Sequence, residues 1–370
     1  WEKKNRQEPP SIAQDTGKKV AVIGAGPAGL AASALLRRYG HKVTIFDASN
    51  TAGGTAWYGV PDYHLPKEVL IDEVEKVKSM GVEIRTNVTI EKDLPVSKLL
   101  EENDAVLITT GSRDTVNLDV PGSNLDGVIS GYEFLETVFS DGVENYLSKP
   151  KYNLGNEILV IGGGDTSLDC ARTALRLTKG EANVTILCKH QKTELHVDPI
   201  MLQEAEEEGV KFKFLVQATS IQHDGNGHVT EATINNLHMR DPDDSGKKEP
   251  VITPNSEIKM KCSTLLISIG RGPNSFLQKK AGINTGKRNS IAISDEFKTS
   301  MKKVFAAGDV TSGETLIVKA MEKGREAAQR VHESLMGLES SHVSFYERYY
   351  TDMSYDKMMK GKEELGPPPD

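Results

Sequence analysis

The stretch "KVAVIGAGPAGLAAS", residues 19–33, decides the fold. A short apolar run typical of a buried strand leads into Gly24, Gly26 and Gly29, and a helical pattern follows. The first glycine allows a tight turn, the second lets backbone approach a pyrophosphate, and the third lets helix and strand pack closely. Asp47 follows about twenty residues later, where an acid would meet ribose hydroxyls. The stretch therefore predicts a dinucleotide-binding strand–turn–helix.

A second stretch, "NEILVIGGGDTSLDCA" at residues 156–171, repeats this pattern. Gly162 and Gly164 occupy the first two glycine positions, and Ser167 stands at the third. Serine is small enough for close packing of helix on strand. One chain thus carries two predicted dinucleotide sites.

The residues that follow the next strand, at 183–187, bear on nucleotide choice. An acid here would bind the ribose 2′-hydroxyl of NADH, but the chain reads "CKHQK" at residues 188–192. Cationic or donor side chains in place of a carboxylate favour the 2′-phosphate of NADPH. Lysine lacks the bidentate fork of arginine, so NADH remains an alternative. The predicted 2′-phosphate ligands are Lys189, His190 and Lys192.

Residues that follow the first glycine turn indicate whether it binds FAD or NAD. Gly53 and Gly54 follow Asp47, "TTGS" closes a predicted strand at residues 109–112, and Asp309 ends another just before a helix. An acid at that strand end can hydrogen-bond a ribityl hydroxyl, and the helix N-terminus can face a reduced flavin's negative charge. Together they favour FAD at the first site.

Composition limits the classes of function. The net charge of −8 argues against a nucleic-acid partner, which needs a basic face. The longest apolar run, residues 20–36, is interrupted by glycines, so no membrane span is expected. The chain has three cysteines and no CxxC, which argues against a metal site or a full iron–sulfur ligand set within it and favours a reducing, cytoplasmic setting. These cysteines are Cys170, Cys188 and Cys262.

The alternation of strand and helix patterns predicts an α/β protein. Strands are expected near residues 41–48, 104–112, 182–189, 264–270 and 303–310, and helices near 67–81, 131–147, 198–209 and 315–335. Between residues 210 and 268 short strands are expected, with a hairpin turn at "DGNG", residues 224–227.

Several stretches identify a family. The chain resembles the glutamate synthase small (β) subunit family of FAD and NAD(P)H electron-transfer flavoproteins. This family includes the flavin subunit of bifurcating ferredoxin–NADP transhydrogenase and the flavin half of dihydropyrimidine dehydrogenase. "YGVPDYHLPK", residues 58–67, is more specific than the glycine motifs, and His64 stands there where the family usually has arginine. Other matching stretches are "VIGGGDTSLDCARTALRL", "ISIGRGPN" and "VFAAGDVTSGETLIVKAMEKGREAA".

The resemblance implies two Rossmann-like domains in the two-dinucleotide flavoprotein fold, with an NAD(P)-binding domain inserted in a discontinuous FAD domain. The FAD domain is expected at residues 18–120 and 265–336, the NAD(P)H domain at 121–264, a linker at 1–17 and an extension, a candidate docking arm, at 337–370. Relatives carry an N-terminal iron–sulfur domain, and "WEKKNRQEPP" resembles the segment that follows it. Because the sequence starts at Trp1, that domain is expected either to be missing here or to be supplied by a partner.

The resemblance also extends the predicted sites. The expected FAD ligands are Gly24, Gly26, Pro27, Ala28, Gly29, Asp47, Ala48, Gly53, Gly54, Thr55, Tyr58, Gly59, His64, Leu65, Val88, Thr110, Gly111, Gly308, Asp309, Glu314, Thr315 and Leu316. The expected NAD(P) ligands are Gly162, Gly163, Gly164, Asp165, Thr166, Ser167, Lys189, His190, Lys192 and Gly270. No side chain is expected to act as a nucleophile, because the flavin carries the chemistry.

Three functions remain open at this point. The first is an oxidoreductase subunit that exchanges a hydride between NAD(P)H and FAD and relays electrons to or from iron–sulfur clusters of a partner in a heteromeric complex. The second is a self-contained flavin reductase or oxidase with a small soluble acceptor. The third is a non-catalytic scaffold with a relict flavin fold, against which the intact glycines at both sites argue.

Overall fold

The computed structural model describes residues 11–141, 153–195, 197–240 and 249–339. The chain divides into two compact units. The first unit contains the described residues of Trp1–Ala52, Glu73–Gly111 and Pro273–Asp370, and the second contains those of Gly53–Asp72 and Ser112–Gly272.

The first unit is built on a five-stranded parallel sheet in the order β15-β4-β1-β2-β3. Its strands are β1 (Lys19–Ile23), β2 (Lys42–Phe46), β3 (Glu83–Arg85), β4 (Ala105–Ile108) and β15 (Val304–Ala306). Alternate side chains of β1 enter separate cores, with Val20 and Val22 on one face and Ala21 and Ile23 on the other. The four residues of this central strand after the exposed Lys19 are therefore all apolar, as burial on both faces requires.

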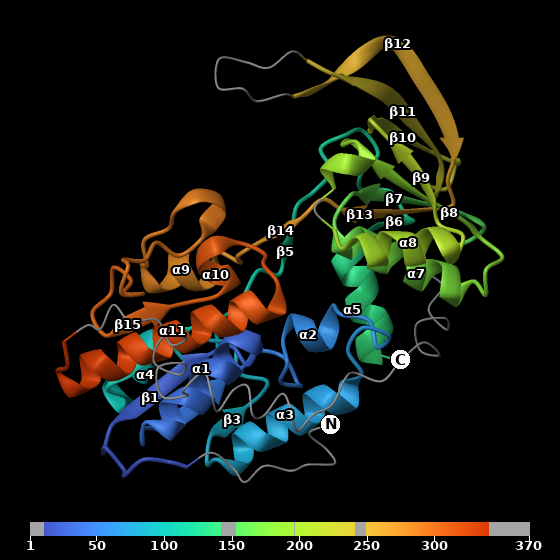
Figure 1. Ribbon diagram of the computed structural model, residues 1–370. Coiled ribbons are helices and arrows are strands. Elements are labelled where there is room, and N and C mark those ends of the chain that lie inside the picture. The colour runs from blue at the N-terminus through green and yellow to red at the C-terminus, as the bar shows by residue number, and fades with distance from the viewer. Residues whose placement is uncertain (1–10, 142–152, 196, 241–248, 340–370) are drawn as a thin grey trace, which may run out of the picture. The chain divides into compact units, whose positions relative to one another are not determined.

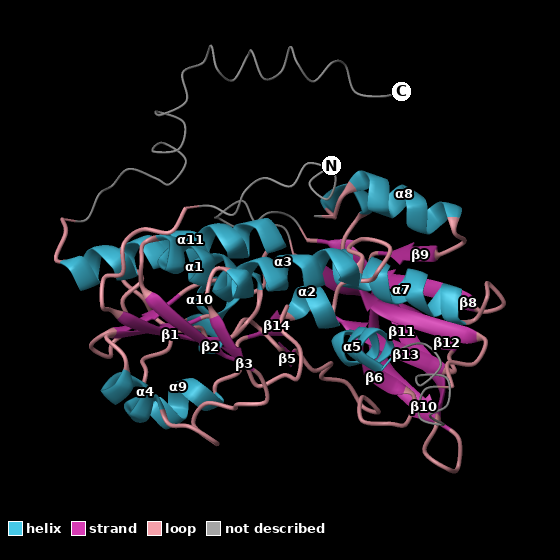
Figure 2. Ribbon diagram, turned by 90° about the horizontal axis from the view of Figure 1, so that it is seen from below, coloured by secondary structure: helices cyan, strands magenta, loops and turns pink. Residues whose placement is uncertain are grey.

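Helices cover both faces of this sheet. Helices α1 (Pro27–Arg38) and α11 (Ile317–Met336) lie on one face, and α4 (Val96–Glu102) and α9 (Phe276–Ala281) on the other (Figure 2). The unit also contains helix α10 (Asp309–Ser312) and the short 3₁₀ helix η3 (Lys287–Asn289). Helix α3 (Lys67–Ser79) is divided between the units and belongs to the first from Glu73 on. Helices α1 and α11 touch through backbone, because a Cβ at Gly324 would lie 2.2 Å from the carbonyl oxygen of Ala28.

The second unit has its own five-stranded parallel sheet, in the order β6-β13-β7-β8-β9 (Figure 1). Its strands are β6 (Val128–Ser130), β7 (Glu157–Gly162), β8 (Asn183–Cys188), β9 (Lys211–Phe214) and β13 (Thr264–Ser268). Helices α5 (Gly131–Asp141), α7 (Asp165–Leu177) and α8 (Pro199–Glu207) pack on one face. Shorter elements are α2 (Thr55–Tyr58), η2 (Lys192–Glu194) and the antiparallel pair β5 (Asp114–Thr115) and β14 (Arg271–Gly272).

An antiparallel sheet of three strands covers the other face: β10 (Val216–His223), β11 (Val229–Met239) and β12 (Pro250–Lys261). The predicted hairpin turn is confirmed between β10 and β11. Asp224 stabilises it, since its Oδ1 accepts from the backbone N–H groups of Asn226 (2.8 Å) and His228 (3.1 Å).

The predicted α/β class with two dinucleotide-type sheets is confirmed. The compact units place residues 53–72, 112–120 and 265–272 with the second unit, whereas the predicted FAD domain included them. Residues 11–17 of the expected linker are held to the first unit, where Ala13 N–H donates to Arg38 O (2.9 Å) and Thr16 N–H to Gly40 O (3.1 Å). The end of the expected helix 131–147 and residues 340–370 of the expected extension lie outside the described residues.

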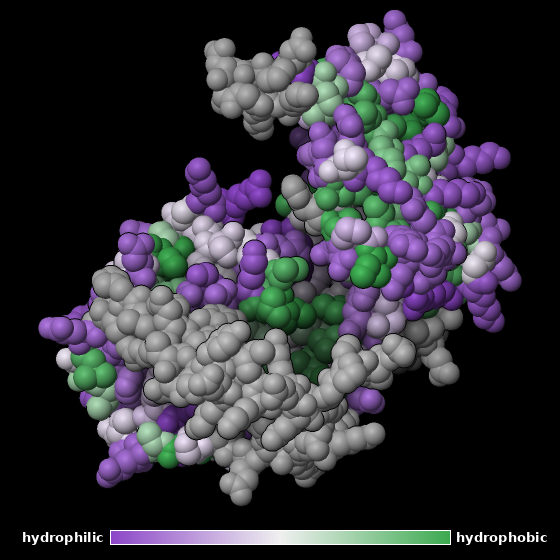
Figure 3. Space-filling model, in the orientation of Figure 1, coloured by the Kyte–Doolittle hydropathy of each residue, from purple (hydrophilic) through white to green (hydrophobic). Residues whose placement is uncertain are grey.

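The described surface is largely hydrophilic in the view of Figure 3. Several large apolar side chains are exposed, among them Leu316 and Val318 at the start of α11. In the described part of the chain, no helix has the length and apolar character needed to cross a membrane.

A pair of histidines joins helix α11 to the turn between α1 and β2. His41 Nε2 lies 2.9 Å from His332 Nδ1, and His41 Nδ1 lies 2.7 Å from the hydroxyl of Thr16. His41 is fully buried, and His332 stacks on Tyr39 with ring centroids 4.2 Å apart. Burial, reinforced by the charge of His332, lowers the pKa of His41 to about 4.

We predict that this pair makes stability depend on pH. The unfolded chain binds a proton at His41 near the ordinary pKa of 6.5 and the folded chain only near 4, so acid between these values favours unfolding. His41 should contribute about 1–3 kcal/mol that is present above pH 6.5 and lost on acidification towards pH 4. Calorimetric melting of wild type and His41→Gln between pH 4.5 and 7.5 measures this. A pH dependence as steep in the variant as in wild type would contradict the assignment.

Candidate functional site

The first glycine turn has no room for side chains. Gly24 has a φ of +109°, and a Cβ there would lie 2.5 Å from the carbonyl oxygen of Thr109. A Cβ at Gly29 would lie 1.9 Å from the carbonyl oxygen of Gly24. The hydroxyl of Thr109 donates to the carbonyls of Ile23 (3.1 Å) and Gly24 (3.0 Å). This packing sets the start of α1 directly against the end of β1.

Asp47 is fixed at the edge of this turn. It is 9% exposed, and its two carboxylate oxygens accept from the backbone N–H groups of Ala25 (2.6 Å) and Ser49 (2.7 Å). Helix α1 begins after Gly26, which supplies no side-chain cap, so the donors of its first turn are left to a ligand or to solvent. An anion-binding helix start beside an oriented carboxylate fits the phosphate and ribose of a dinucleotide.

The structure brings further predicted FAD residues to this turn. Val88 N–H donates to the carbonyl of Asp47 (2.9 Å), and Thr110 lies beside Gly24. Gly308, from the C-terminal part of the chain, also lies at this turn. A Cβ built on it would lie 2.9 Å from the Cβ of Ala28. The next residue, Asp309, begins α10, and its carboxylate accepts from the hydroxyl of Thr315 (2.7 Å). The predicted residues that fall in the second unit instead are Gly53, Gly54, Thr55, Tyr58, Gly59, His64 and Leu65.

The second glycine turn is built in the same way in the second unit. Gly162 has a φ of +153°, and a Cβ there would lie 2.3 Å from the carbonyl oxygen of Ser268. Ser167 replaces the third glycine, and its hydroxyl donates to that same carbonyl (3.3 Å). Gly164 precedes α7 without a side-chain cap and is exposed, with no atom within 4 Å of a Cβ built on it. The helix start is therefore open to a ligand at this residue.

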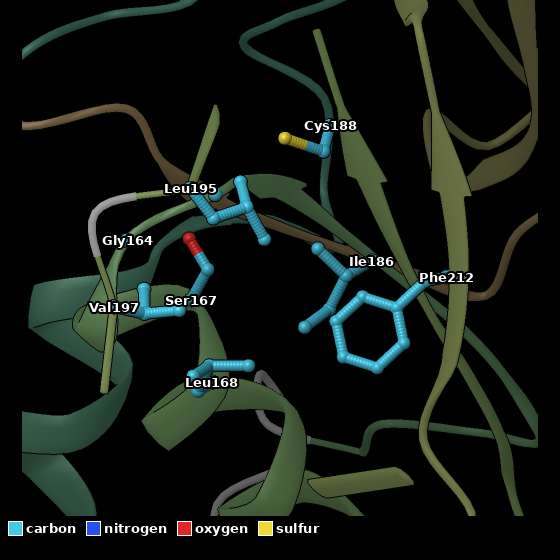
Figure 4. A pocket seen from close by; sticks show the side chains of 9 residues that line it. Gly164, Ser167, Leu168, Ile186, Cys188, Leu195, Val197 and Phe212 are labelled. Carbon is cyan, nitrogen blue, oxygen red and sulfur yellow. The ribbon is translucent and has the colours of Figure 1, made fainter. Parts of the chain in front are cut away.

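A small apolar gap lies beneath the second turn. Leu168, Ile186, Leu195 and Phe212 turn toward one another around it (Figure 4). Its volume of about 10 Å³ is close to that of a single water site, so it is a packing gap and not a nucleotide pocket.

Cys188, at the end of β8, also borders this gap, and its side chain leaves little room for a side chain at position 163. A Cβ at Gly163 would lie 2.5 Å from the Cys188 sulfur. The middle glycine of the turn is thus required by packing against the strand end.

The predicted phosphate ligands after β8 differ in whether their side chains are already paired. Lys189 is exposed, and the carbonyl of His190 accepts from Leu215 N–H (3.4 Å). Lys192 begins η2 and turns to α8, where its Nζ lies 2.6 Å from Glu206 Oε1. Of the three predicted phosphate ligands, Lys192 is thus already paired with a carboxylate. Gly270 lies in the second unit, and its carbonyl accepts from Val116 N–H (3.0 Å).

The three cysteines are buried and free. Burial raises the pKa of Cys170 and of Cys262 to about 12 and also raises that of Cys188. Thiols that stay protonated are poor nucleophiles and poor metal ligands. Among the described residues, no group of three or more His, Cys, Asp and Glu side chains is arranged to hold a metal.

The sequence analysis gave no role to Asp169, and the structure places it in a polar cluster. Its Oδ1 lies 3.0 Å from His64 Nε2, so this predicted flavin residue contacts helix α7. One signal in the sequence could have indicated this cluster. Asp169 lies within a largely buried helix, where a carboxylate needs a partner.

The family is established by comparison with known proteins. Residues 18–324 match the family described as pyridine nucleotide-disulphide oxidoreductase. The glutamate synthase (NADPH) small chain of Escherichia coli K12 is 33% identical over 326 residues, which are 86% of this chain and 69% of that protein. The chain belongs to this family and is an NAD(P)-dependent flavoprotein oxidoreductase similar to the glutamate synthase small chain.

Other relatives are about twice as long as the part that matches. The NADP(+)-dependent formate dehydrogenase subunit beta of Moorella thermoacetica is 35% identical over 329 residues, 88% of this chain but 45% of that protein. The NADPH-Fe(3+) oxidoreductase subunit beta of Geobacter sulfurreducens is 32% identical over 337 residues, 84% of this chain and 49% of that protein.

Solved structures share the fold. FprA from Mycobacterium tuberculosis in complex with NADPH matches with a TM-score of 0.73 at 15% identity, over 94% of this chain and 89% of that chain. Thioredoxin reductase from T. acidophilum matches with a TM-score of 0.61 at 22% identity, over 86% of this chain and 99% of that chain. At these identities the likeness concerns the fold.

We predict that Gly164→Val separates binding from folding. No atom lies within 4 Å of the new Cβ, so the melting temperature should stay within about 2 °C of wild type. The side chain would occupy the space in which backbone approaches a pyrophosphate, and NADP⁺ should bind about tenfold more weakly or worse. Calorimetric titration with NADP⁺ measures the change. Gly225→Ala, equally uncrowded in the β10–β11 turn, is the control. Unchanged NADP⁺ affinity in Gly164→Val would place the nucleotide elsewhere.

Proposed function

We propose that this chain is the FAD-containing subunit of a larger cytoplasmic oxidoreductase. It exchanges a hydride between NADP(H) and FAD and relays electrons to or from iron–sulfur clusters of a partner subunit or domain. Two glycine turns of the dinucleotide type in one chain, each with an uncapped helix start, support this proposal most directly.

The first turn has the features that suit FAD. Asp47, held by two backbone N–H groups, would accept hydrogen bonds from ribose hydroxyls. Asp309, which accepts from Thr315, would bind the ribityl chain, and Gly308 leaves room for it beside Ala28. When bound, FAD would accept two electrons as a hydride and return them singly, which is the chemistry that an iron–sulfur partner needs.

The second turn has the features that suit NADPH. Its helix start is open at Gly164, and β8 is followed by Lys189 and His190 where NADH would need a carboxylate. Three similar relatives carry NADPH or NADP(+) in their names, which is consistent with this choice.

The cysteines bear on where the electrons go. Because all three are buried and free, the disulfide exchange that gives the family its name has no thiol pair in this chain. The similar relatives are named as a small chain or as subunits beta, which supports delivery of electrons to another subunit.

We predict rapid anaerobic reduction of the bound flavin by NADPH and slower reduction by NADH, followed by its visible absorption in a stopped-flow instrument. The reduced protein should then pass electrons faster to a ferredoxin, a one-electron iron–sulfur acceptor, than to menadione or oxygen. Fast turnover with menadione or oxygen alone would support a self-contained reductase. Failure of both nucleotides to reduce the flavin would withdraw the hydride-transfer proposal.

We predict that Lys189 determines the preference for NADPH. Lys189→Ala should weaken NADPH binding about tenfold and leave NADH binding unchanged, because it removes a charge that only a 2′-phosphate uses. Lys192→Ala is the comparison and should have a smaller effect, since Lys192 is paired with Glu206. Dissociation constants for NADP⁺ and NAD⁺ measure both. Equal losses for the two nucleotides would contradict a role in recognising the phosphate.

A further inference from the structure

The segment Gly53–Asp72 is fastened to helix α7 of the second unit. His64 Nε2 lies 3.0 Å from Asp169 Oδ1, and the hydroxyl of Tyr63 donates to the same oxygen at 3.4 Å. Asp169 is 8% exposed, and the His64 side chain is 26% exposed. A buried carboxylate needs hydrogen-bond partners, and the His64 ring and the Tyr63 hydroxyl supply them.

Tyr63 strengthens the attachment along the same helix. The guanidinium groups of Arg172 and Arg176 lie 4.8 and 4.0 Å from its ring centroid. Burial, followed by the charge of Asp169, raises the pKa of Tyr63, so its hydroxyl keeps the proton that it donates.

The two arginines are themselves held in place by helix α8. Arg172 and Arg176 each donate to Glu208 Oε1 at 2.6 Å, and Arg172 also reaches Glu204 at 2.9 Å. Positions 169, 172 and 176 are spaced by three and four residues and so form one face of α7. The segment Gly53–Asp72 therefore contacts successive turns of α7, a helix that ion pairs hold to α8.

Helix α7 also carries the proposed nucleotide site. It begins at Asp165, directly after the open Gly164, and Asp169 lies one turn further on. Thr55, Tyr58 and Gly59, predicted at the flavin, belong to the attached segment. The same helix thus connects the NADP(H) turn to the residues expected around the flavin.

We propose that His64 is a positioning residue. Through Asp169, it couples occupancy of the second glycine turn to the conformation of the segment Gly53–Asp72. This inference rests on the proposed function, in which that turn binds NADP(H). Ligand contacts with the first turn of α7 restrict its opening, and the His64–Asp169 bond passes the restriction to the segment.

Hydrogen–deuterium exchange on the FAD-loaded chain tests this with adenosine 2′,5′-bisphosphate as the probe. The probe has the 2′-phosphate and the adenosine 5′-phosphate of NADPH but no nicotinamide, so it does not place a nicotinamide near the flavin segment. In wild type it should slow exchange both in residues 162–168 and in residues 58–66, the latter by about tenfold. In His64→Gln, residues 162–168 should stay protected and residues 58–66 should not respond.

Two further variants separate positioning from general destabilisation. His64→Arg places a hydrogen-bond donor opposite Asp169 and should restore the response of residues 58–66, and adding Asp169→Asn should abolish that rescue. His238→Gln is the matched control, because His238 is an exposed histidine of the same unit bonded to Thr253 on the antiparallel sheet. It should behave as wild type.

Kinetics give an independent measurement. His64→Gln should lower the limiting rate of flavin reduction by NADPH about tenfold, with NADP⁺ affinity within about twofold of wild type, and His64→Arg should recover the rate.

The outcomes that would overturn each proposal are distinct. A response of residues 58–66 to the probe that survives in His64→Gln would overturn the role of His64 while leaving NADPH binding intact. Absence of protection at residues 162–168 in wild type would instead overturn the proposed nucleotide site, and the coupling with it.

Discussion

The absence of a Cβ at two turns is the constraint on which the rest of this structure depends. At Gly24 and at Gly162, a Cβ would lie 2.5 and 2.3 Å from a carbonyl oxygen of a neighbouring strand end. Only glycine, with a positive φ and no side chain, lets the chain reverse there and start a helix against the sheet. The helix start, with the positive end of its dipole, is thereby aimed at the edge where parallel strands end and ligands bind in such sheets.

This constraint is local in sequence, and for that reason the glycine spacing predicted both turns, their strands and the α/β class. The position of Asp47 followed from strand length, and the structure holds it by backbone N–H groups that any sequence would supply. Ser167 was expected to be tolerated, and it is used, since its hydroxyl bonds the neighbouring strand. Short-range geometry is thus sufficient to predict most of the fold and the two glycine turns.

What the sequence did not predict depends on residues far apart in the chain. His64 was expected at the flavin, and nothing near it in sequence identifies Asp169, which lies 105 positions away, as its partner. Lys192 was predicted as a ligand of the 2′-phosphate, and nothing in the sequence indicates its ion pair with Glu206 on α8. Such pairings are fixed by how helices pack on a sheet, and the charge pattern of a single segment holds no information about them.

The attachment of residues 53–72 to α7 links this segment to the proposed nucleotide turn within the second unit. A segment held only by packing would sample conformations independently of the nucleotide. Here the attachment depends on a carboxylate that is only 8% exposed, because moving His64 away would remove one of the hydrogen-bond partners of Asp169 in a place poorly reached by water. The cost of that separation ties the segment to the state of α7. Under the proposed function such a link is useful for hydride exchange, since residues that are predicted to bind FAD would then respond to the arrival of NADP(H) at α7.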